Sequence, residues 1–575
     1  MKKKLIPALV SALIATAGAR AAQPENGTTR NAYFGDLHLH TVYSFDAYVL
    51  LGAKANPWDA YRFARGEEVN YLGHRVRRDE PLDFLAVTDH SENIGVMNEL
   101  DDPNSALSKS EIGQRIKKDP TQAFWEVVKL FTSGQPLPGV DAKAVSQSAW
   151  QREIDAANQN YVPGKFTTFI GYEWSSMPEG KYNLHRNVIF SGDKAPFPFS
   201  SVDSRRPEDL WSYLEKARAQ GVQAIAIPHN GNASGGLMYD WVDSDGKPID
   251  QAYAERRALN EPLTEISQNK GQSETHPTLS SSDEFANFEV FDRLLIGSEK
   301  SEVHGSYVRE AYGRGLVINQ RVGANPYKYG VTGGSDFHNA FSTSSEKQYT
   351  GSVGGIGAEE DAPNAQQAQT ILGGQVSREA PLAMLITGSG NLTGVWAEEN
   401  TRESIFDALR RKETFATSGT KIKLRFFGGW NYDKKLLAKT SWVQTAYSQG
   451  APMGGDLPAK PSATAKPRFV VWTIKDPNGV NLDRAQVVKV WLKDGGYDEK
   501  VFDVAKSKGA TELSTVWEDP EFDPKVPAVY YLRVLETPTK RWSTLLAEKR
   551  GLAPPKDQPK TIQERAWSSP IWYAP

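Results

Sequence analysis

The sequence predicts an α/β protein with a β-rich tail. Short apolar runs rich in β-branched residues alternate with longer helical stretches from residue 33 to about residue 419. After that point the pattern changes to β-rich runs separated by Gly, Pro, Asp and Asn. The chain has 575 residues, so a large domain with at least one accessory domain is expected. Strands that alternate with helices indicate βα units and a mainly parallel sheet, either open or closed into a barrel.

The elements of the first part follow from hydrophobic periodicity. Strands are expected at residues 33–40, 82–88, 166–173, 187–190, 222–227, 263–267, 288–291 and 330–333. Helices between them are expected at residues 58–64, 122–131, 146–158, 207–220 and 307–313. A further helix at 402–412 is expected to begin with Asn400 and Glu403 as a capping pair.

Two insertions and a tail complete the predicted domain organisation. The insertions lie at about 93–144 and 342–381, and the second is rich in Gly, Ser, Ala and Gln, which is typical of an exposed loop. The first domain is expected over residues 30–420. Residues 421–575 predict a small antiparallel β domain, with strands at 421–427, 468–474, 485–492, 528–535 and 566–572.

The N-terminus predicts export. Lys2, Lys3 and Lys4 precede an apolar run that ends in small residues near Ala21 and Ala22, which is the order of a secretory signal over residues 1–22. The apolar run is too short to span a bilayer, and no later run has spanning length. A periplasmic or secreted location is therefore expected.

Composition limits the possible partners and ligands. Removal of residues 1–22 would take four basic residues and no acid, and so change the formal net charge from −3 to −7. A mildly acidic protein gives no reason to expect nucleic acid or a membrane as its partner, and the oligomeric state is not indicated. The chain has no cysteine, which excludes disulfides and thiolate metal sites, so any metal must bind nitrogen and oxygen ligands.

The histidines point to metal chemistry, because most of the nine stand beside acids at predicted strand ends. Alternation along a strand aims Asp36, His38 and His40 at one face. Because the carboxyl ends of parallel strands meet at one rim, side chains from several strands are expected to converge there. The candidate metal ligands are His38, His40, Asp46, His90, Glu173, His185, His229, Asp336 and His338.

Other polar residues have less specific contexts. His74 and His304 have polar neighbours and are interpreted as surface residues. His276 lies in a Ser/Thr-rich loop and is a substrate contact, a general acid or an ordinary loop residue. Asp36 and Asp89 lie near ligand candidates and are expected to orient imidazole rings. Arg186, Asn230 and Lys270 are candidates for holding substrate oxygens.

These motifs resemble the polymerase and histidinol phosphatase (PHP) superfamily. The matching features are Asp36 to Ser44, Thr88 to His90, Glu173, two separate histidines (His185 and His229), and Gly334 to His338, in the same order along the chain. The signal sequence, the long insertions and the β-rich tail resemble its exported branch, domain of unknown function 3604. The resemblance covers residues 30–420 strongly and the tail weakly.

The resemblance implies a distorted (β/α)7 TIM-like barrel that binds two or three divalent ions. One ion would take His38, His40, Glu173 and Asp336. A second would take Asp46, His90 and His338, and a third His185 and His229 with Glu173 bridging. The Asp46 position is often His in relatives, and this departure bears on the affinity, identity or occupancy of the second ion.

The predicted function is metal-dependent hydrolysis of a small phosphate ester, either a monoester or a diester. Three divalent ions would bring +6 against −3 from Asp46, Glu173 and Asp336, a balance that suits a phosphate. In this hypothesis a metal-bound hydroxide attacks phosphorus. Zn, Mn and Fe fit the ligands equally well. The alternatives are an amidohydrolase-like enzyme acting on an amide, lactone or sulfate ester, and a non-catalytic binding protein held together by metal.

Overall fold

The computed structural model describes residues 30–575 except 134–136, 138, 297–298, 351–363 and 373–386. The predicted signal peptide, residues 1–22, lies outside the described residues. Much of the predicted second insertion, 342–381, also lies outside them.

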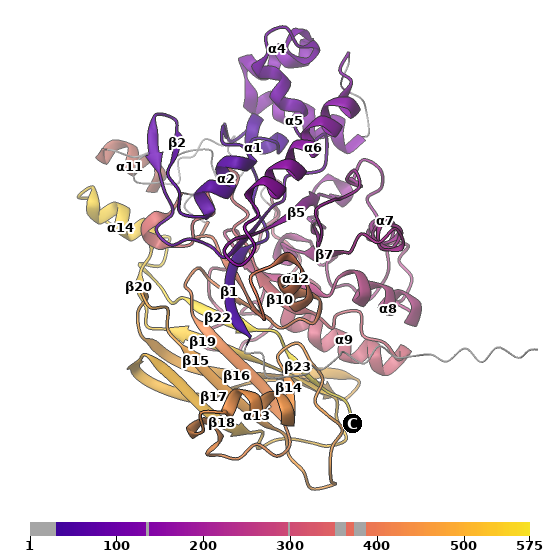
Figure 1. The fold of residues 1–575 in the computed structure, drawn as a ribbon, viewed down its shortest axis with the longest axis vertical. Coiled ribbons are helices and arrows are strands. Elements are labelled where there is room, and N and C mark those ends of the chain that lie inside the picture. Colours follow the sequence, from indigo (N-terminus) through magenta and orange to yellow (C-terminus); the bar gives the residue numbers. More distant parts are fainter. Residues whose placement is uncertain (1–29, 134–136, 138, 297–298, 351–363, 373–386) are drawn as a thin grey trace, which may run out of the picture.

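A twelve-stranded mixed sheet runs through the molecule (Figure 1), in the order β17-β16-β19-β22-β12-β11-β1-β4-β5-β6-β7, with β23 paired to β19. The strands from the first part of the chain are β1 (Asn31–Asp36), β4 (Phe84–Val87), β5 (Thr167–Trp174), β6 (Arg186–Phe190), β7 (Ala224–Pro228), β11 (Leu392–Ala397) and β12 (Thr414–Thr417). The strands β1, β4 and β5 are parallel, whereas β6 runs antiparallel to both of its neighbours and β11 runs antiparallel to β1. The predicted α/β class is confirmed, and the sheet is more mixed than predicted.

A second sheet completes the first part of the chain. It consists of β10 (Gly330–Gly333), β8 (Leu263–Gln268) and β9 (Gly271–Gln272), and β10 pairs with β8 in parallel. Within the described ranges no hydrogen-bonded ladder joins β7 to β8, so the structure does not show the barrel closure that the resemblance implied.

Helices cover the central strands, which are buried on both faces; every residue of β4 and of β5 is buried. The principal helices are α2 (Pro57–Ala64), α6 (Ala142–Asn160), α7 (Pro207–Ala219), α8 (Gln251–Asn260), α9 (Val308–Val322) and α12 (Arg402–Arg410). The start of α2 shows how local sequence sets these elements, because Asn56 and Asp59 form a capping box and Pro57 occupies the first turn.

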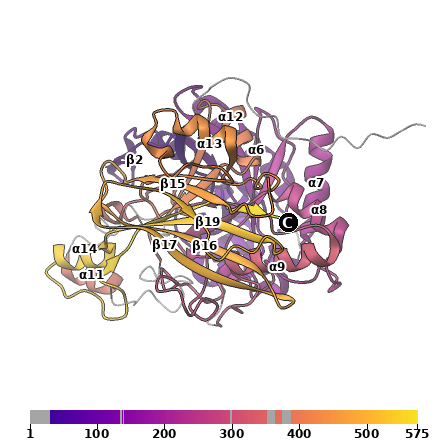
Figure 2. The same ribbon diagram turned by 90° about the horizontal axis from the view of Figure 1, so that it is seen from below.

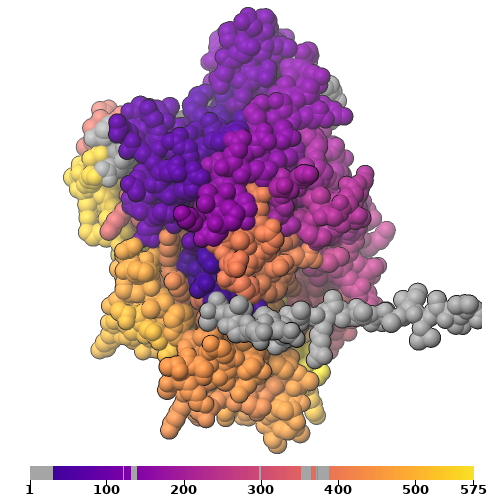
Figure 3. Space-filling model, in the orientation of Figure 1, coloured from indigo at the N-terminus to yellow at the C-terminus, as the bar shows by residue number. Residues whose placement is uncertain are grey.

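The first insertion forms a helical lobe at the top of Figure 1, which projects in the space-filling view of Figure 3. It contains α3 (Ala106–Lys109), α4 (Glu111–Lys118) and α5 (Pro120–Ser133). Leu107, Ile112, Ile116 and Val127 belong to its buried core.

Two predicted elements differ from the structure. Residues 288–291 form no strand, because Phe288 packs on Trp567 and under the guanidinium of Arg565 from the tail. The helix α12 is capped by Thr401, whose hydroxyl accepts the Ser404 amide. The Asn400 amide donates instead to the carbonyls of Asp83 and Lys165, so the predicted capping pair is wrong.

The tail is antiparallel, as predicted, but only part of it forms a sheet of its own. Part of it is a four-stranded sheet of β14 (Gly450–Pro452), β13 (Lys423–Gly429), β15 (Arg468–Ile474) and β18 (Glu512–Glu518). Five other tail strands extend the large sheet. These are β16 (Leu482–Lys493), β17 (Gly496–Ala510), β19 (Ala528–Glu536), β22 (Arg565–Ser568) and β23 (Ile571–Tyr573). Three of them, β16, β17 and β19, lie side by side in the view from below (Figure 2). In the described ranges, no helix combines the length and apolar character needed to cross a bilayer.

Candidate metal centre

Side chains from separate strands converge at one edge of the sheet. His38 and His40 follow β1, His90 follows β4, and Glu173 lies near the end of β5. His229 follows β7, while Asp336 and His338 follow β10. His185 precedes β6, and because β6 runs antiparallel to β5, its first residues lie at this same edge. A parallel bridge between His90 and Glu173 and another between Leu39 and Phe337 hold these strand ends together.

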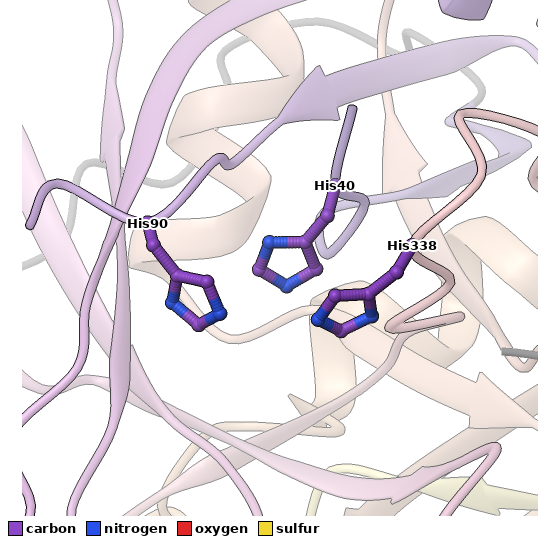
Figure 4. Close-up of side chains that lie close together, drawn as sticks. All are labelled: His40, His90 and His338. Atoms are coloured by element: carbon purple, nitrogen blue, oxygen red, sulfur yellow. The ribbon is translucent and has the colours of Figure 1, made fainter. Parts of the chain in front are cut away.

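Three of the imidazole rings face one another directly (Figure 4). The ring centroids of His40 and His338 are 4.0 Å apart, and those of His40 and His90 are 4.5 Å apart. All three residues are buried. These three imidazole rings, which come from distant parts of the sequence, therefore pack together in the protein interior.

Carboxylates lie among the rings. Glu173 Oε2 is 3.2 Å from His38 Nε2 and 3.0 Å from His40 Nε2, and its Oε1 is 3.4 Å from His229 Nε2. Asp336 Oδ1 is 3.3 Å from His40 Nε2. Glu173 is therefore the shared centre of the cluster.

The hydrogen bonds around Ser44 determine which His40 nitrogen carries hydrogen. The Ser44 hydroxyl donates to Asp89 Oδ1 at 2.6 Å, so its single hydrogen is already used. The 2.9 Å contact between Ser44 Oγ and His40 Nδ1 must then be donated by the ring. In a neutral imidazole Nε2 would carry only a lone pair, and that atom faces the oxygens of Glu173 and Asp336.

His338 has the same arrangement. Its Nδ1 lies 3.0 Å from the backbone carbonyl of Asp336, which only accepts, so the ring donates there. Its Nε2 lies 3.0 Å from Asp46 Oδ2, and His90 Nε2 lies 3.3 Å from the same oxygen. Acceptors that face acceptors at these distances require a cation between them, either a proton or a metal ion.

Metal ions fit this donor set. Four groups of three residues each place one ligating atom per residue within 4.8 Å of the others. Within the described chain, His40 Nε2 and His185 Nε2 are buried without a hydrogen-bond partner, as expected for nitrogens that bind a metal. The four groups are His40, His90 and His338; His38, Glu173 and His229; His38, His40 and Asp336; and His90, Glu173 and His185.

The electrostatics keep the carboxylates ionised. Burial alone would raise the pKa of Asp46, but the neighbouring charges of His338 and His90 hold it well below its usual range. Burial likewise opposes ionisation of Glu173, but the charge of His90 and the hydrogen bond from His185 outweigh it, so the pKa of Glu173 is also well below its usual range. Burial, reinforced by the charge of His38, lowers the pKa of His229 to about 3, which keeps that ring neutral and able to bind a metal.

Comparison with known proteins places the chain in a family. It matches the family described as Protein of unknown function (DUF3604) over residues 27–511 and 505–575. The chain belongs to this family. The family membership predicted from the motifs is therefore confirmed. No curated protein of similar sequence was found.

Among solved structures, the chain is similar to a two-domain protein from Bacteroides vulgatus that contains a predicted PHP-like metal-dependent phosphoesterase. The identity is 10% and the TM-score is 0.31, with 88% of this chain and 94% of that chain covered. Any function of this DUF3604 member is therefore inferred from its own residues.

Two predicted catalytic residues, Arg186 and His276, form hydrogen bonds with residues outside the metal centre. The guanidinium of Arg186 donates to Glu261 at 3.0 Å and to the Leu184 carbonyl. His276 Nδ1 lies 2.7 Å from the Thr278 hydroxyl, and its ring packs on Tyr307. Neither side chain belongs to a group of potential metal ligands.

The two aspartates predicted to orient imidazoles act less directly. Asp89 accepts hydrogen bonds from Thr41 and Ser44, so it reaches His40 only through Ser44. Asp36 accepts the backbone amides of His38 and Ser335 and therefore fixes backbone rather than a ring.

The sequence interpretation missed Glu265. Its Oε2 lies 3.0 Å from His38 Nδ1, so it orients the His38 ring. Gly334 makes this contact possible, because a Cβ there would lie 2.2 Å from Glu265 Oε2 and 2.7 Å from His38 Cβ. The only signal in the sequence was an acid inside the predicted strand 263–267.

Lys270 reaches the cluster by a contact that the sequence did not specify. Its ammonium group binds Asp336 Oδ2, and the Gln268 amide donates to the same oxygen at 2.7 Å. The other oxygen of Asp336 is left facing the histidines.

Proposed function

We propose that this protein is a metal-dependent hydrolase of phosphate esters. The observation that supports it most strongly is the pair of acceptor-to-acceptor contacts, His40 Nε2 to Glu173 and His338 Nε2 to Asp46, at 3.0 Å each. Glu173, Asp336, His38 and His40 would hold one ion. Asp46, His90 and His338 would hold a second, and His185 and His229 with Glu173 a third.

The charge of the site favours an anionic substrate. Asp46, Glu173, Glu265 and Asp336 contribute −4 and Lys270 contributes +1, so two divalent ions would leave the site at +1 and three at +3. A phosphate ester matches this balance, whereas a neutral amide or lactone does not use it. Divalent ions bound there would polarise a phosphoryl oxygen and lower the pKa of water that they bind.

The chain's own groups would position the substrate. Lys270 is 4% exposed and its ammonium group sits at Asp336, so it offers a fixed positive charge beside the ligands. Asn230 follows His229 in a left-handed conformation, with φ of 51°. Its Nδ2 is buried without a partner among the described residues, and it supplies a donor for a substrate oxygen.

The test is hydrolysis of p-nitrophenyl phosphate and bis(p-nitrophenyl) phosphate, with and without chelator. We expect activity that chelator removes and Zn²⁺, Mn²⁺ or Fe²⁺ restores. His229→Ala should lose one ion and most of the activity. His304→Ala changes a side chain that is 70% exposed, and it should keep its metal content and its activity. Metal-dependent turnover of a lactone or sulfate ester without phosphatase activity would replace the proposed substrate class, and bound metal without any turnover would favour the binding protein.

We also propose that the chain is exported. Residues 1–22 have the basic, apolar and small-residue order of a secretory signal. N-terminal sequencing of the protein from its host should give a start near residue 22 or 23, and an intact Met1 would refute export by this signal.

A further inference from the structure

A cavity of about 390 Å³ lies within the tail. One wall is a face of the large sheet, formed by β16 and β19, and the other is the loop that leads into β19, residues 521–526. These strands lie in the lower half of Figure 1. No candidate ligand of the metal centre lines this cavity, so it is a separate site.

The strand register explains why this face of the sheet is hollow. Lys489, Trp491 and Lys493 line the cavity from one face of β16, because alternate side chains of a strand point to the same side. On β19 the residue opposite Lys489 is Tyr530, and the residue opposite Trp491 is Ala528. Ala528 carries only a methyl group, so it leaves space beside the indole that a larger side chain would fill.

The cavity offers aromatic surface from both walls. Trp491 on the sheet and Phe522 on the loop line it, and both side chains are partly exposed. The Phe522 ring is fixed by Trp430 and Tyr573, whose ring centroids lie 5.8 and 4.9 Å from its own. A partly exposed ring that is already ordered can cover an apolar part of a ligand at little cost in conformational entropy.

The same cavity offers a hydrogen-bond donor and several acceptors. Lys489 is 4% exposed, and its ammonium group donates to Asp519 at 2.6 Å and to the Glu521 carbonyl at 2.8 Å. An ammonium group has three hydrogens, so one of them has no oxygen acceptor among the described residues. Asp494 and Asp523 are exposed lining residues whose carboxylates supply acceptors.

The charges of the lining are largely paired within the protein. Lys493 pairs with Asp498 at 2.7 Å, and Glu521 pairs with Lys500. Lys489 is paired as described above, and the two remaining acids are exposed and screened by water. The cavity therefore has no strong net attraction for a charged ligand, and it favours a neutral ligand that both donates and accepts hydrogen bonds.

We propose that this cavity binds a neutral saccharide, with the apolar face of one sugar ring packed on Trp491. A sugar ring presents C–H groups on its face and hydroxyls at its edge, and each hydroxyl both donates and accepts. The aromatic surface fits the C–H face, while the Lys489 ammonium group and the exposed carboxylates fit the hydroxyls. The volume is within the range of small-molecule sites.

The test is saturation-transfer difference NMR of the purified chain with cellobiose, maltose and N,N′-diacetylchitobiose, followed by calorimetric titration of the sugar that gives the strongest signal. We expect saturable binding to one site, with the largest transfer to the C–H protons on one face of a ring. Chelator should leave the affinity unchanged, because no metal ligand lines the cavity. Benzoate and 2-phenylethylammonium, aromatic ions of opposite charge, should bind at least about tenfold more weakly than the sugar.

Matched variants assign the site. Trp491→Ala should weaken sugar binding at least about tenfold, whereas Trp491→Phe keeps an aromatic face and should weaken it less. Trp125→Ala removes an indole that is 38% exposed on the helical lobe, and it should change the affinity less than about twofold. Should Trp491→Ala fail to fold, Phe522→Ala on the loop wall serves as the second variant, and its binding should also weaken.

Three outcomes would overturn saccharide binding at this cavity. They are no binding of any of the three sugars at about 10 mM, on the order of the weakest useful affinity, equal binding by Trp491→Ala and the natural chain, and tighter binding of either aromatic ion than of every sugar. None of these outcomes bears on phosphatase activity, which depends on the metal centre.

Discussion

At the residue scale, the metal centre depends on groups that accept a hydrogen bond from Nδ1 of each imidazole and so fix the orientation of the ring. His40 donates to Ser44, His38 to Glu265 and His338 to the Asp336 carbonyl, which leaves Nε2 of each ring directed at a carboxylate. Metal-binding histidines are generally held in this way through their second nitrogen.

Ser44 provides the sharpest residue-scale prediction. Ser44→Ala removes the acceptor for His40 Nδ1 and one donor to Asp89, so the ring loses its fixed tautomer. We expect metal affinity to fall by roughly 10- to 100-fold, measured by competition with a chromophoric chelator. Ser448→Ala, at an exposed serine of α13 (Trp442–Gln449), is the control and should leave affinity unchanged. Unchanged affinity in Ser44→Ala would contradict the assigned hydrogen-bond direction.

Individual site residues were predictable where a polar side chain ends an apolar strand. The direction of the Arg186 side chain was harder to predict, because adjacent residues along a strand point to opposite sides, and its guanidinium binds Glu261 rather than a residue of the cluster. Glu265 was missed because an acid within a strand is usually solvent-exposed, whereas β8 is buried throughout.

At the element scale, strand direction and connections were harder to predict than strand existence. The position of His185 before β6, rather than after it, was the one signal that β6 runs antiparallel. The central strand β11 was not predicted, because Gly394 weakens a strand pattern. In the structure that glycine gives space to the ring of Phe415, which lies 2.2 Å from where a Cβ would be.

The start of α12 gives an element-scale prediction. Thr401→Ala removes the side-chain acceptor for the Ser404 amide and should lower the free energy of unfolding by about 0.5–2 kcal/mol. Urea denaturation followed by circular dichroism measures this change. Glu403→Ala is the control, with an expected change below about 0.5 kcal/mol; a larger loss in that variant than in Thr401→Ala would restore the capping pair with Asn400.

At the scale of the whole molecule, the tail is continuous with the strands that build the metal centre. The strand β22 pairs with β12, which pairs with β11, and β11 pairs with β1. The expected boundary at residue 420 falls beside β12, so a cut there would expose a strand edge that the tail covers. Sequence periodicity shows that strands exist and does not show which distant strands pair, and the shared sheet was therefore not predictable.

A buried ion network joins the two parts. Arg533 on β19 donates to Glu274 at 3.1 Å and to Asp283 at 2.7 Å, and Arg309 on α9 donates to the same two acids. Both arginines are 0% exposed. Removal of one partner would leave an uncompensated buried charge.

Arg533→Met should therefore lower the free energy of unfolding by about 3–5 kcal/mol, measured as a shift in denaturation midpoint. Lys493→Met breaks an exposed pair with Asp498 and should cost less than about 1 kcal/mol. Equal effects of the two substitutions would show that the network contributes no more than a surface pair.

The same network predicts an acid dependence. Burial opposes ionisation of Glu274, but Arg533 and Arg309 outweigh it and lower its pKa to about 2. Its stabilising contribution is then complete above its unfolded pKa of about 4.3 and is lost as the pH falls through about 2. Stability measured between pH 5 and pH 2 should fall more steeply in the natural protein than in Arg533→Met. Parallel curves would contradict this.

The central claim is that residues from Asp36 to His338 gather around shared divalent ions. Anomalous diffraction from crystals grown with Zn²⁺ tests it most directly. We predict two or three peaks within the cluster, with one about 2.0–2.1 Å from Nε2 of His40 or His338 and one beside Glu173. Crystals that bind Zn²⁺ only elsewhere, with His40 and His338 still facing Glu173 and Asp46 and no peak between them, would contradict the account.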